Sequence, residues 1–217
     1  GLYAEAFFEE DVHKVIAAGL ACIPPDSQYA EMVRDVVSWH REAPDDWTRT
    51  WQRCLKKYRK DPAYQKASNG AIDVKINGAM VLLGLLYGEG DMGKTVVIAM
   101  RGGYDSDCNP SSAAGVLSTM TGFSKLPVRY TQALELEPKF SYTAYNVPAL
   151  LDVCERLARQ VVARQGGRIE RDADGREWFG IAACPAHPGP VMLSWAPGRV
   201  AGSCFTDEEY AKIRFKP

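Results

Sequence analysis

Helical periodicity, interrupted at regular points, is the feature that most constrains the fold of this chain. Between residues 2 and 60, apolar residues recur every three or four positions, as on one face of an α-helix. Prolines at positions 24, 25 and 44 interrupt the pattern, because proline cannot continue a helix. Residues that can cap a following helix are Asp11, Ser27 and Asp45 or Asp46. The pattern predicts four helices: 2–10, 11–22, one from after 27 to about 44, and one over about 47–58.

The apolar block over residues 72–87 predicts a buried helix. It consists mainly of Ala, Leu, Met and Gly rather than β-branched residues, and it is too long for a typical strand. Gly88 is expected to end this helix, and Asp91 to cap a shorter one that runs through Met100. Asn109–Pro110 is expected to open the next helix, because proline is favoured at the first helical position.

The last third of the chain changes character. Residues 147–165 form the pattern of a long amphipathic helix whose apolar stripe is expected to face inward: Leu150, Leu151, Cys154, Leu157 and Val161. Residues 168–181 predict a hairpin around Asp174–Gly175, and residues 191–205 predict further short strands. The fold class is therefore mainly α, with a small C-terminal β-rich extension. We divide the chain into a helical part, 1–128, and a long helix with the β-rich extension, 129–217.

Composition excludes several classes of protein. Apolar residues make up 46% and charged residues 24% of the 217 residues, as in ordinary globular proteins. Lys and Arg total 26 against 27 Asp and Glu, so no broad positive field favours binding to nucleic acid. No stretch is long and apolar enough to cross a membrane, and no export signal is visible at the start of the sequence.

The six cysteines are scattered and lack the short paired spacings of zinc sites. They also lack the density of a small disulfide-rich scaffold. Three of them lie within helical patterns and are expected to be small buried apolar groups: Cys22, Cys54 and Cys154.

Residues 88–95 match the pattern of a phosphate-binding loop. Such a loop must follow a β-strand, whereas the preceding block predicts a helix. Glu89 and Asp91 would also place negative charge among backbone amides that should attract an anion. We keep nucleotide binding here as a lesser alternative.

Asp105 and Asp107 are the residues that point most directly to chemistry. They stand two positions apart, after Gly102–Gly103 and before a predicted helix, so both carboxylates can converge on one divalent cation. The alternative is structural: Asp107 caps the next helix, and Asp105 makes a hydrogen bond within the turn. The spacing alone leaves both interpretations open.

Residues 77–91, NGAMVLLGLLYGEGD, and 102–115, GGYDSDCNPSSAAG, resemble the ADP-ribosylglycohydrolase family. In that family a helix ending in a Tyr-Gly turn leads through a short helix to a Gly-Gly-Asp-x-Asp-Thr-Asn-like loop. The agreement in order, spacing and glycine placement extends over about residues 72–123. Residues 2–58 look similar to the helices that precede this segment in a bacterial branch, and the β-rich tail resembles an extension found there.

The resemblance implies an orthogonal multi-helix domain that holds two Mg²⁺ ions, which position the ribose of an ADP-ribosyl group for hydrolysis at its anomeric carbon. It assigns Asp105 and Asp107 as metal ligands and places Cys108 where the family usually has a threonine hydroxyl ligand. A soft thiol is a poor ligand for Mg²⁺. Gly102, Gly103 and Tyr104 are implied to line the substrate pocket; no catalytic residue is assigned.

The family's N-terminal half carries a Thr-Asp-Asp-Thr-like motif that this sequence lacks. We therefore expect the chain to supply one side of a two-metal site, with the missing N-terminal half as a further partner. The predicted function is hydrolysis, with Mg²⁺, of an N- or O-glycosidic bond to ADP-ribose or a related ribosyl group, on a small molecule or a modified macromolecule. The alternative from another class is a catalytically inactive binding or structural module of the same fold.

Overall fold

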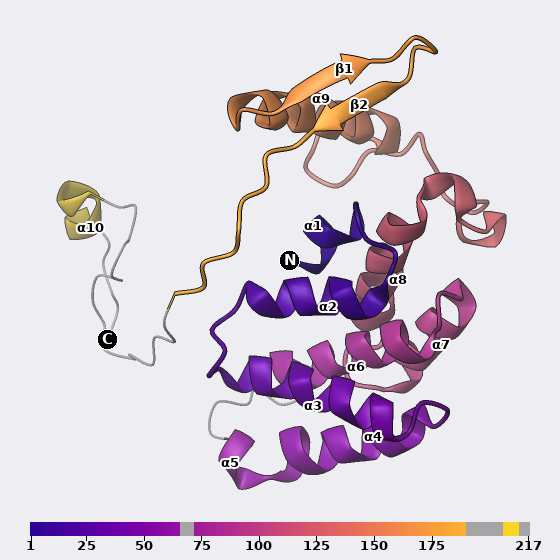
Figure 1. The fold of residues 1–217 in the computed structure, drawn as a ribbon, viewed down its shortest axis with the longest axis vertical. Coiled ribbons are helices and arrows are strands. Elements are labelled where there is room, and N and C mark those ends of the chain that lie inside the picture. The colour runs from indigo at the N-terminus through magenta and orange to yellow at the C-terminus, as the bar shows by residue number, and fades with distance from the viewer. Residues whose placement is uncertain (66–71, 190–205, 213–217) are drawn as a thin grey trace.

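The computed structural model describes residues 1–65, 72–189 and 206–212, and it is mainly helical (Figure 1). The helices of the first part are α1 (Leu2–Ala6), α2 (Val12–Ala21), α3 (Gln28–Glu42), α4 (Trp47–Cys54), the π-helical η1 (Leu55–Lys60) and α5 (Pro62–Gln65). They are followed by α6 (Val74–Tyr87), α7 (Met92–Arg101), α8 (Cys108–Thr121) and the 3₁₀ turns η3 (Phe123–Lys125) and η4 (Val128–Tyr130). The remaining elements are α9 (Val147–Arg164), β1 (Arg168–Arg171), β2 (Glu177–Gly180) and α10 (Asp207–Lys212).

Capping side chains begin the helices where the sequence predicts. The carboxylate of Asp11 accepts a hydrogen bond from the amide of His13, and Ser27 and Asp46 cap α3 and α4 in the same manner. Each cap satisfies an amide that has no partner within its own helix. The first helix is shorter than predicted: it ends at Ala6 rather than at residue 10.

Helix α6 lies at the centre of the helical body and contacts α2, α3, α4, α7 and α8 (Figure 1). Most of its side chains are buried, as its apolar composition predicts. Gly84 permits the close approach of α7, because a Cβ there would lie 2.8 Å from the carbonyl oxygen of Thr95 and 2.9 Å from Cβ of Ala99. Two core clusters form around α6, one toward α3 and α4 and the other toward α1, α7 and α8.

The segment with the phosphate-loop pattern, residues 88–95, follows a helix and not a strand, as expected. Asp91 caps α7 by accepting a hydrogen bond from the amide of Lys94. The ammonium group of Lys94 lies 3.1 Å from the carboxylate of Glu89. The segment is thus the junction of two helices, with its lysine paired to an acidic neighbour, and this context does not favour nucleotide binding.

The hairpin of β1 and β2 packs against α9, and together they lie at one end of the molecule beyond α1 and α8 (Figure 1). The hairpin confirms the prediction around Asp174–Gly175. The prediction that the apolar stripe of α9 faces inward is wrong: Leu151 is 64% exposed and Leu157 51%. The hairpin instead contacts the opposite side of α9, where Arg159 pairs with Glu177 and lies over the ring of Phe179.

Burial of the cysteines follows the prediction only at Cys54. Cys22 and Cys154 are exposed, because Cys22 follows the last residue of α2 and Cys154 lies on the uncovered stripe of α9.

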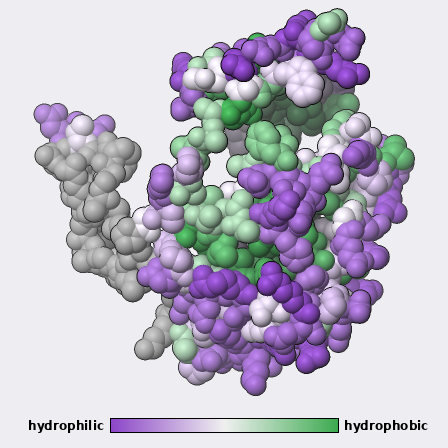
Figure 2. Space-filling view, in the orientation of Figure 1, coloured by the Kyte–Doolittle hydropathy of each residue, from purple (hydrophilic) through white to green (hydrophobic). Residues whose placement is uncertain are grey.

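The strands predicted over 191–205 lie outside the described residues. None of the helices among the described residues is both long and apolar enough to span a membrane. Figure 2 shows hydrophobic residues gathered in the middle of one face, between more hydrophilic rims.

Candidate metal centre

The loop of residues 102–107, here called the acidic loop, connects α7 to α8. Gly102 follows the last residue of α7, and Gly103 has a φ of 84°, in the left-handed region where glycine is favoured. Tyr104 also lies there, with a φ of 65°. This conformation costs a residue with a Cβ roughly 1–2 kcal/mol. The backbone turn that carries Asp105 is therefore strained and must be held by its surroundings.

Two neighbouring side chains hold the start of the acidic loop. A Cβ at Gly102 would lie 2.3 Å from Sδ of Met80, so the lack of a side chain here lets the loop pack closely against α6. The indole Nε1 of Trp51 donates a hydrogen bond of 2.9 Å to the carbonyl oxygen of Gly102. The loop is thus anchored to α6 on one side and to α4 on the other.

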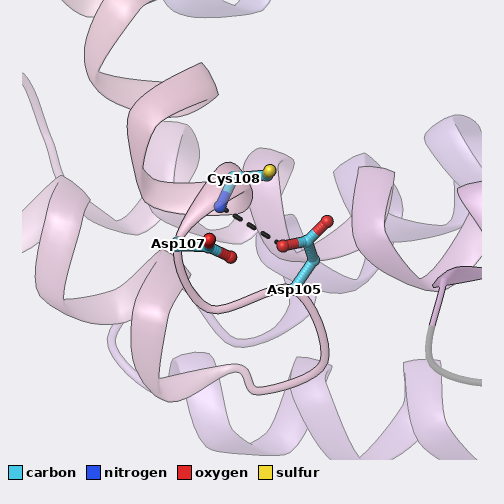
Figure 3. A group of neighbouring side chains, drawn as sticks. All are labelled: Asp105, Asp107 and Cys108. Carbon is cyan, nitrogen blue, oxygen red and sulfur yellow. Dashed lines mark hydrogen bonds between the residues drawn. The ribbon is translucent and has the colours of Figure 1, made fainter.

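The acidic loop and the first residue of α8 bring the three predicted metal ligands together. The atoms that could ligate a metal, one carboxylate oxygen each of Asp105 and Asp107 and Sγ of Cys108, all lie within 4.8 Å of one another. Among the described residues, this is the only group of three or more acidic, cysteine or histidine side chains that meets this condition. In Figure 3 the carboxylates of Asp105 and Asp107 face each other across the loop.

The two carboxylates make few hydrogen bonds with the start of α8. Asp107 occupies the position before α8 but makes no capping hydrogen bond with its side chain. Asp105 accepts a hydrogen bond from the amide of Cys108 at 3.4 Å, which is long for such a bond. The structural alternative is therefore met only in part: Asp105 accepts one long hydrogen bond from Cys108, and Asp107 makes no capping hydrogen bond.

The protonation of the group indicates which ions it suits. Hydrogen bonds with the Asp105 carboxyl and from backbone amides lower the pKa of Asp107, so this side chain is negatively charged at neutral pH. A hydrogen bond with Asp105, together with the negative charges of Asp105 and Asp107, raises the pKa of the Cys108 thiol. Two carboxylates suit a hard divalent cation, whereas a soft thiol is a poor ligand for it.

Two asparagines that the sequence prediction missed connect the acidic loop to α6. The side-chain oxygen of Asn77 accepts hydrogen bonds from the amide of Asp105, at 3.0 Å, and from Nδ2 of Asn109, at 2.9 Å. Asn109 is only 3% exposed, and its Nδ2 also lies 3.4 Å from the carbonyl oxygen of Gly103. The available signal was the amide side chain of Asn77, which interrupts a mainly apolar helix.

The residues predicted to line a substrate pocket lie at the start of the acidic loop. Gly102 is buried, Gly103 is half-buried, and the ring of Tyr104 packs against the core cluster toward α3 and α4. A mostly apolar cavity of about 400 Å³ lies between α1, α2, α3, α6 and α8, and its lining includes none of residues 102–108. Substrate contact by Gly102, Gly103 and Tyr104 stays a prediction.

Comparisons with known proteins identify one family. The family model described as ADP-ribosylglycohydrolase matches residues 1–169, a range that contains the acidic loop, both asparagines and α9. Searches among curated proteins and among solved structures found no match.

Proposed function

The chain belongs to the ADP-ribosylglycohydrolase family, and we propose that it takes part in metal-dependent hydrolysis of an N- or O-glycosidic bond to ADP-ribose or a related ribosyl group. Family membership supports a glycosidic hydrolase in general and implies ADP-ribosylated substrates. The metal, the bond and the roles of individual residues are the proposal. As substrates we propose an ADP-ribosylated small molecule or macromolecule.

One observation carries the proposal: the carboxylates of Asp105 and Asp107 face each other, and the start of α8 binds them only through one long hydrogen bond, from the amide of Cys108 to Asp105. Both residues lie within the part of the chain that matches the family. Two acidic side chains at this separation repel each other unless a proton or a cation lies between them. Mg²⁺ is proposed as that cation, because carboxylate oxygens are the protein ligands it prefers. Bound there, it would supply positive charge that orients and polarises oxygens of the ribosyl group.

The residues of this chain would bind and orient rather than transfer protons. Asp105 and Asp107 would hold the ion, and the hydrogen bonds at Gly102 and Asp105 would fix the loop that carries them. Cys108 would contribute little to binding, because a soft sulfur is a poor ligand for Mg²⁺. A second ion needs further acidic ligands, which we propose come from a partner segment, so the 217-residue chain alone is expected to bind metal weakly and turn over slowly.

The proposal is tested by incubating the chain with ADP-ribosylated peptides and measuring released ADP-ribose by chromatography. We expect slow release that requires Mg²⁺ and stops when EDTA is added. Asp105→Asn and Asp107→Asn should each lower the rate roughly 100-fold, because each removes charge from the electrostatic centre. Asp45→Asn is the matched control, since Asp45 is exposed and lies outside the centre. Release that is insensitive to EDTA and to both variants would contradict the proposal.

A catalytically inactive binding module is the second candidate. The thiol of Cys108, at the place where a metal-binding hydroxyl is expected, favours it, because the altered donor set would hold an ion less well. This candidate predicts that ADP-ribose binds the chain in the presence of Mg²⁺ while no hydrolysis is detected. Calorimetric titration with ADP-ribose, run beside the hydrolysis assay, separates the two.

A further inference from the structure

The side chain of Asn77 stands between the central helix and the acidic loop. Its oxygen accepts the amide proton of Asp105, at 3.0 Å, and a proton from Nδ2 of Asn109, at 2.9 Å. Its own Nδ2 donates to the carbonyl oxygen of Asp73, the capping residue before α6, at 3.1 Å. One partly buried amide therefore connects α6 with both sides of the metal-binding segment.

The acidic loop needs such a contact. Gly103 and Tyr104 both have positive φ values, and Asp105 follows them directly. A strained backbone keeps its conformation only when the surrounding groups determine it. The amide of Asp105 comes directly after the strained pair and donates a hydrogen bond to the side chain of Asn77, on α6. Asn77 therefore fixes the position of the main chain at Asp105.

Asn109, on α8, also bonds to Asn77 and to the acidic loop. It is 3% exposed, and the proton donors of its amide lie near two acceptors: the oxygen of Asn77 and the carbonyl oxygen of Gly103. Removing the oxygen of Asn77 would leave Asn109 and the amide of Asp105 without this acceptor in a partly buried site. The loop would then relax toward conformations that part the two carboxylates.

We infer that Asn77 is a positioning residue for the metal centre: its side-chain oxygen holds the main chain of Asp105 so that the carboxylate stays turned toward Asp107. This inference rests on the proposed function, because it assigns Asn77 a role toward the ion that Asp105 and Asp107 would bind. Groups that orient metal ligands without touching the ion commonly change metal affinity by about 10- to 100-fold when removed.

The test is a titration of the 217-residue chain with Mn²⁺, followed by electron paramagnetic resonance of the free ion. Asn77→Leu keeps the approximate volume and removes the oxygen; it should weaken Mn²⁺ binding by about 10-fold or more. Asn77→Asp keeps an acceptor oxygen and should bind Mn²⁺ at least as well as the unaltered chain. If Asn77→Leu does not fold, Asn77→Ser serves instead, because its hydroxyl is too short to reach both donors.

Tyr87→Phe is the matched control for a merely structural role. Tyr87 lies on the same helix, and its hydroxyl bonds to Thr50 and to the carbonyl oxygen of Ala43, which lie outside the acidic loop. This variant should lose stability and keep its Mn²⁺ affinity. Unchanged affinity in both Asn77→Leu and Asn77→Ser, or equal weakening in Tyr87→Phe, would overturn the inference and leave the proposed function standing. Absence of Mn²⁺ binding by the unaltered chain would overturn both.

Discussion

Replacing Trp51 by phenylalanine tests whether α4 anchors the acidic loop. The indole Nε1 of Trp51 donates a 2.9 Å hydrogen bond to the carbonyl oxygen of Gly102, which is a buried residue. Phenylalanine keeps most of the apolar contact and removes the donor. An acceptor left without its partner costs about 1–3 kcal/mol when buried, and the half-buried position of Trp51 favours the lower part of that range, about 1–2 kcal/mol.

Trp47→Phe is the matched control, since Trp47 lies one turn earlier on α4 and is also half-buried. Its indole has no hydrogen-bond partner among the residues that the structure describes. Both variants lose a similar volume, so the difference between them reports the hydrogen bond. Urea unfolding followed by circular dichroism should show Trp51→Phe to be less stable than Trp47→Phe by about 1–2 kcal/mol, or roughly 2–8 °C in Tm for a chain of this size. Equal stability of the two variants would refute the anchoring role of Trp51.

Three further predictions concern other positions. Tyr87→Phe removes a hydroxyl that bonds to Thr50 at 2.7 Å and donates to the carbonyl oxygen of Ala43 at 2.9 Å, and urea unfolding should show a loss of about 1–3 kcal/mol. Asp46 caps α4 and has a pKa below its ordinary value of 3.8, so its stabilisation is present above pH 3.8 and is lost as the pH falls through the lower folded-state pKa. Thermal melting of Asp46→Ala against the unaltered chain should show a constant difference at pH 5–7 that shrinks below pH 3.8; a difference independent of pH would contradict this. Cys108→Ser supplies a hard hydroxyl in place of the thiol, and calorimetry should show a higher Mg²⁺ affinity. Unchanged affinity would exclude a ligand role at this position, and weaker binding would contradict the view that the thiol is a poor ligand.

The positions of most helices could be predicted from the sequence because their causes are local. Asp11, Ser27 and Asp91 cap helices within a few residues of themselves, and the apolar composition of α6 predicts its burial. The acidic loop was found in the same way, because two carboxylates at close spacing after paired glycines need no distant contact to suggest a cation site.

The environment of these elements depends on contacts that the sequence does not encode locally. The apolar stripe of α9 has the correct period, yet periodicity cannot show which element covers it, and the hairpin packs against the side that carries Arg159. Asn77 lies 28 residues before Asp105, so their hydrogen bond appears only when α6 and the acidic loop are placed side by side. The hydrogen bond between Trp51 and Gly102 likewise spans 51 positions, so no local pattern indicates it.

The most direct test of the metal centre is a crystal structure of the chain grown or soaked with Mn²⁺ and recorded at a wavelength where manganese scatters anomalously. The account predicts an anomalous peak between the side chains of Asp105 and Asp107, roughly 2.1 Å from an oxygen of each carboxylate. A map without a peak at this position, with both carboxylates bonded instead to amides at the start of α8, would contradict it.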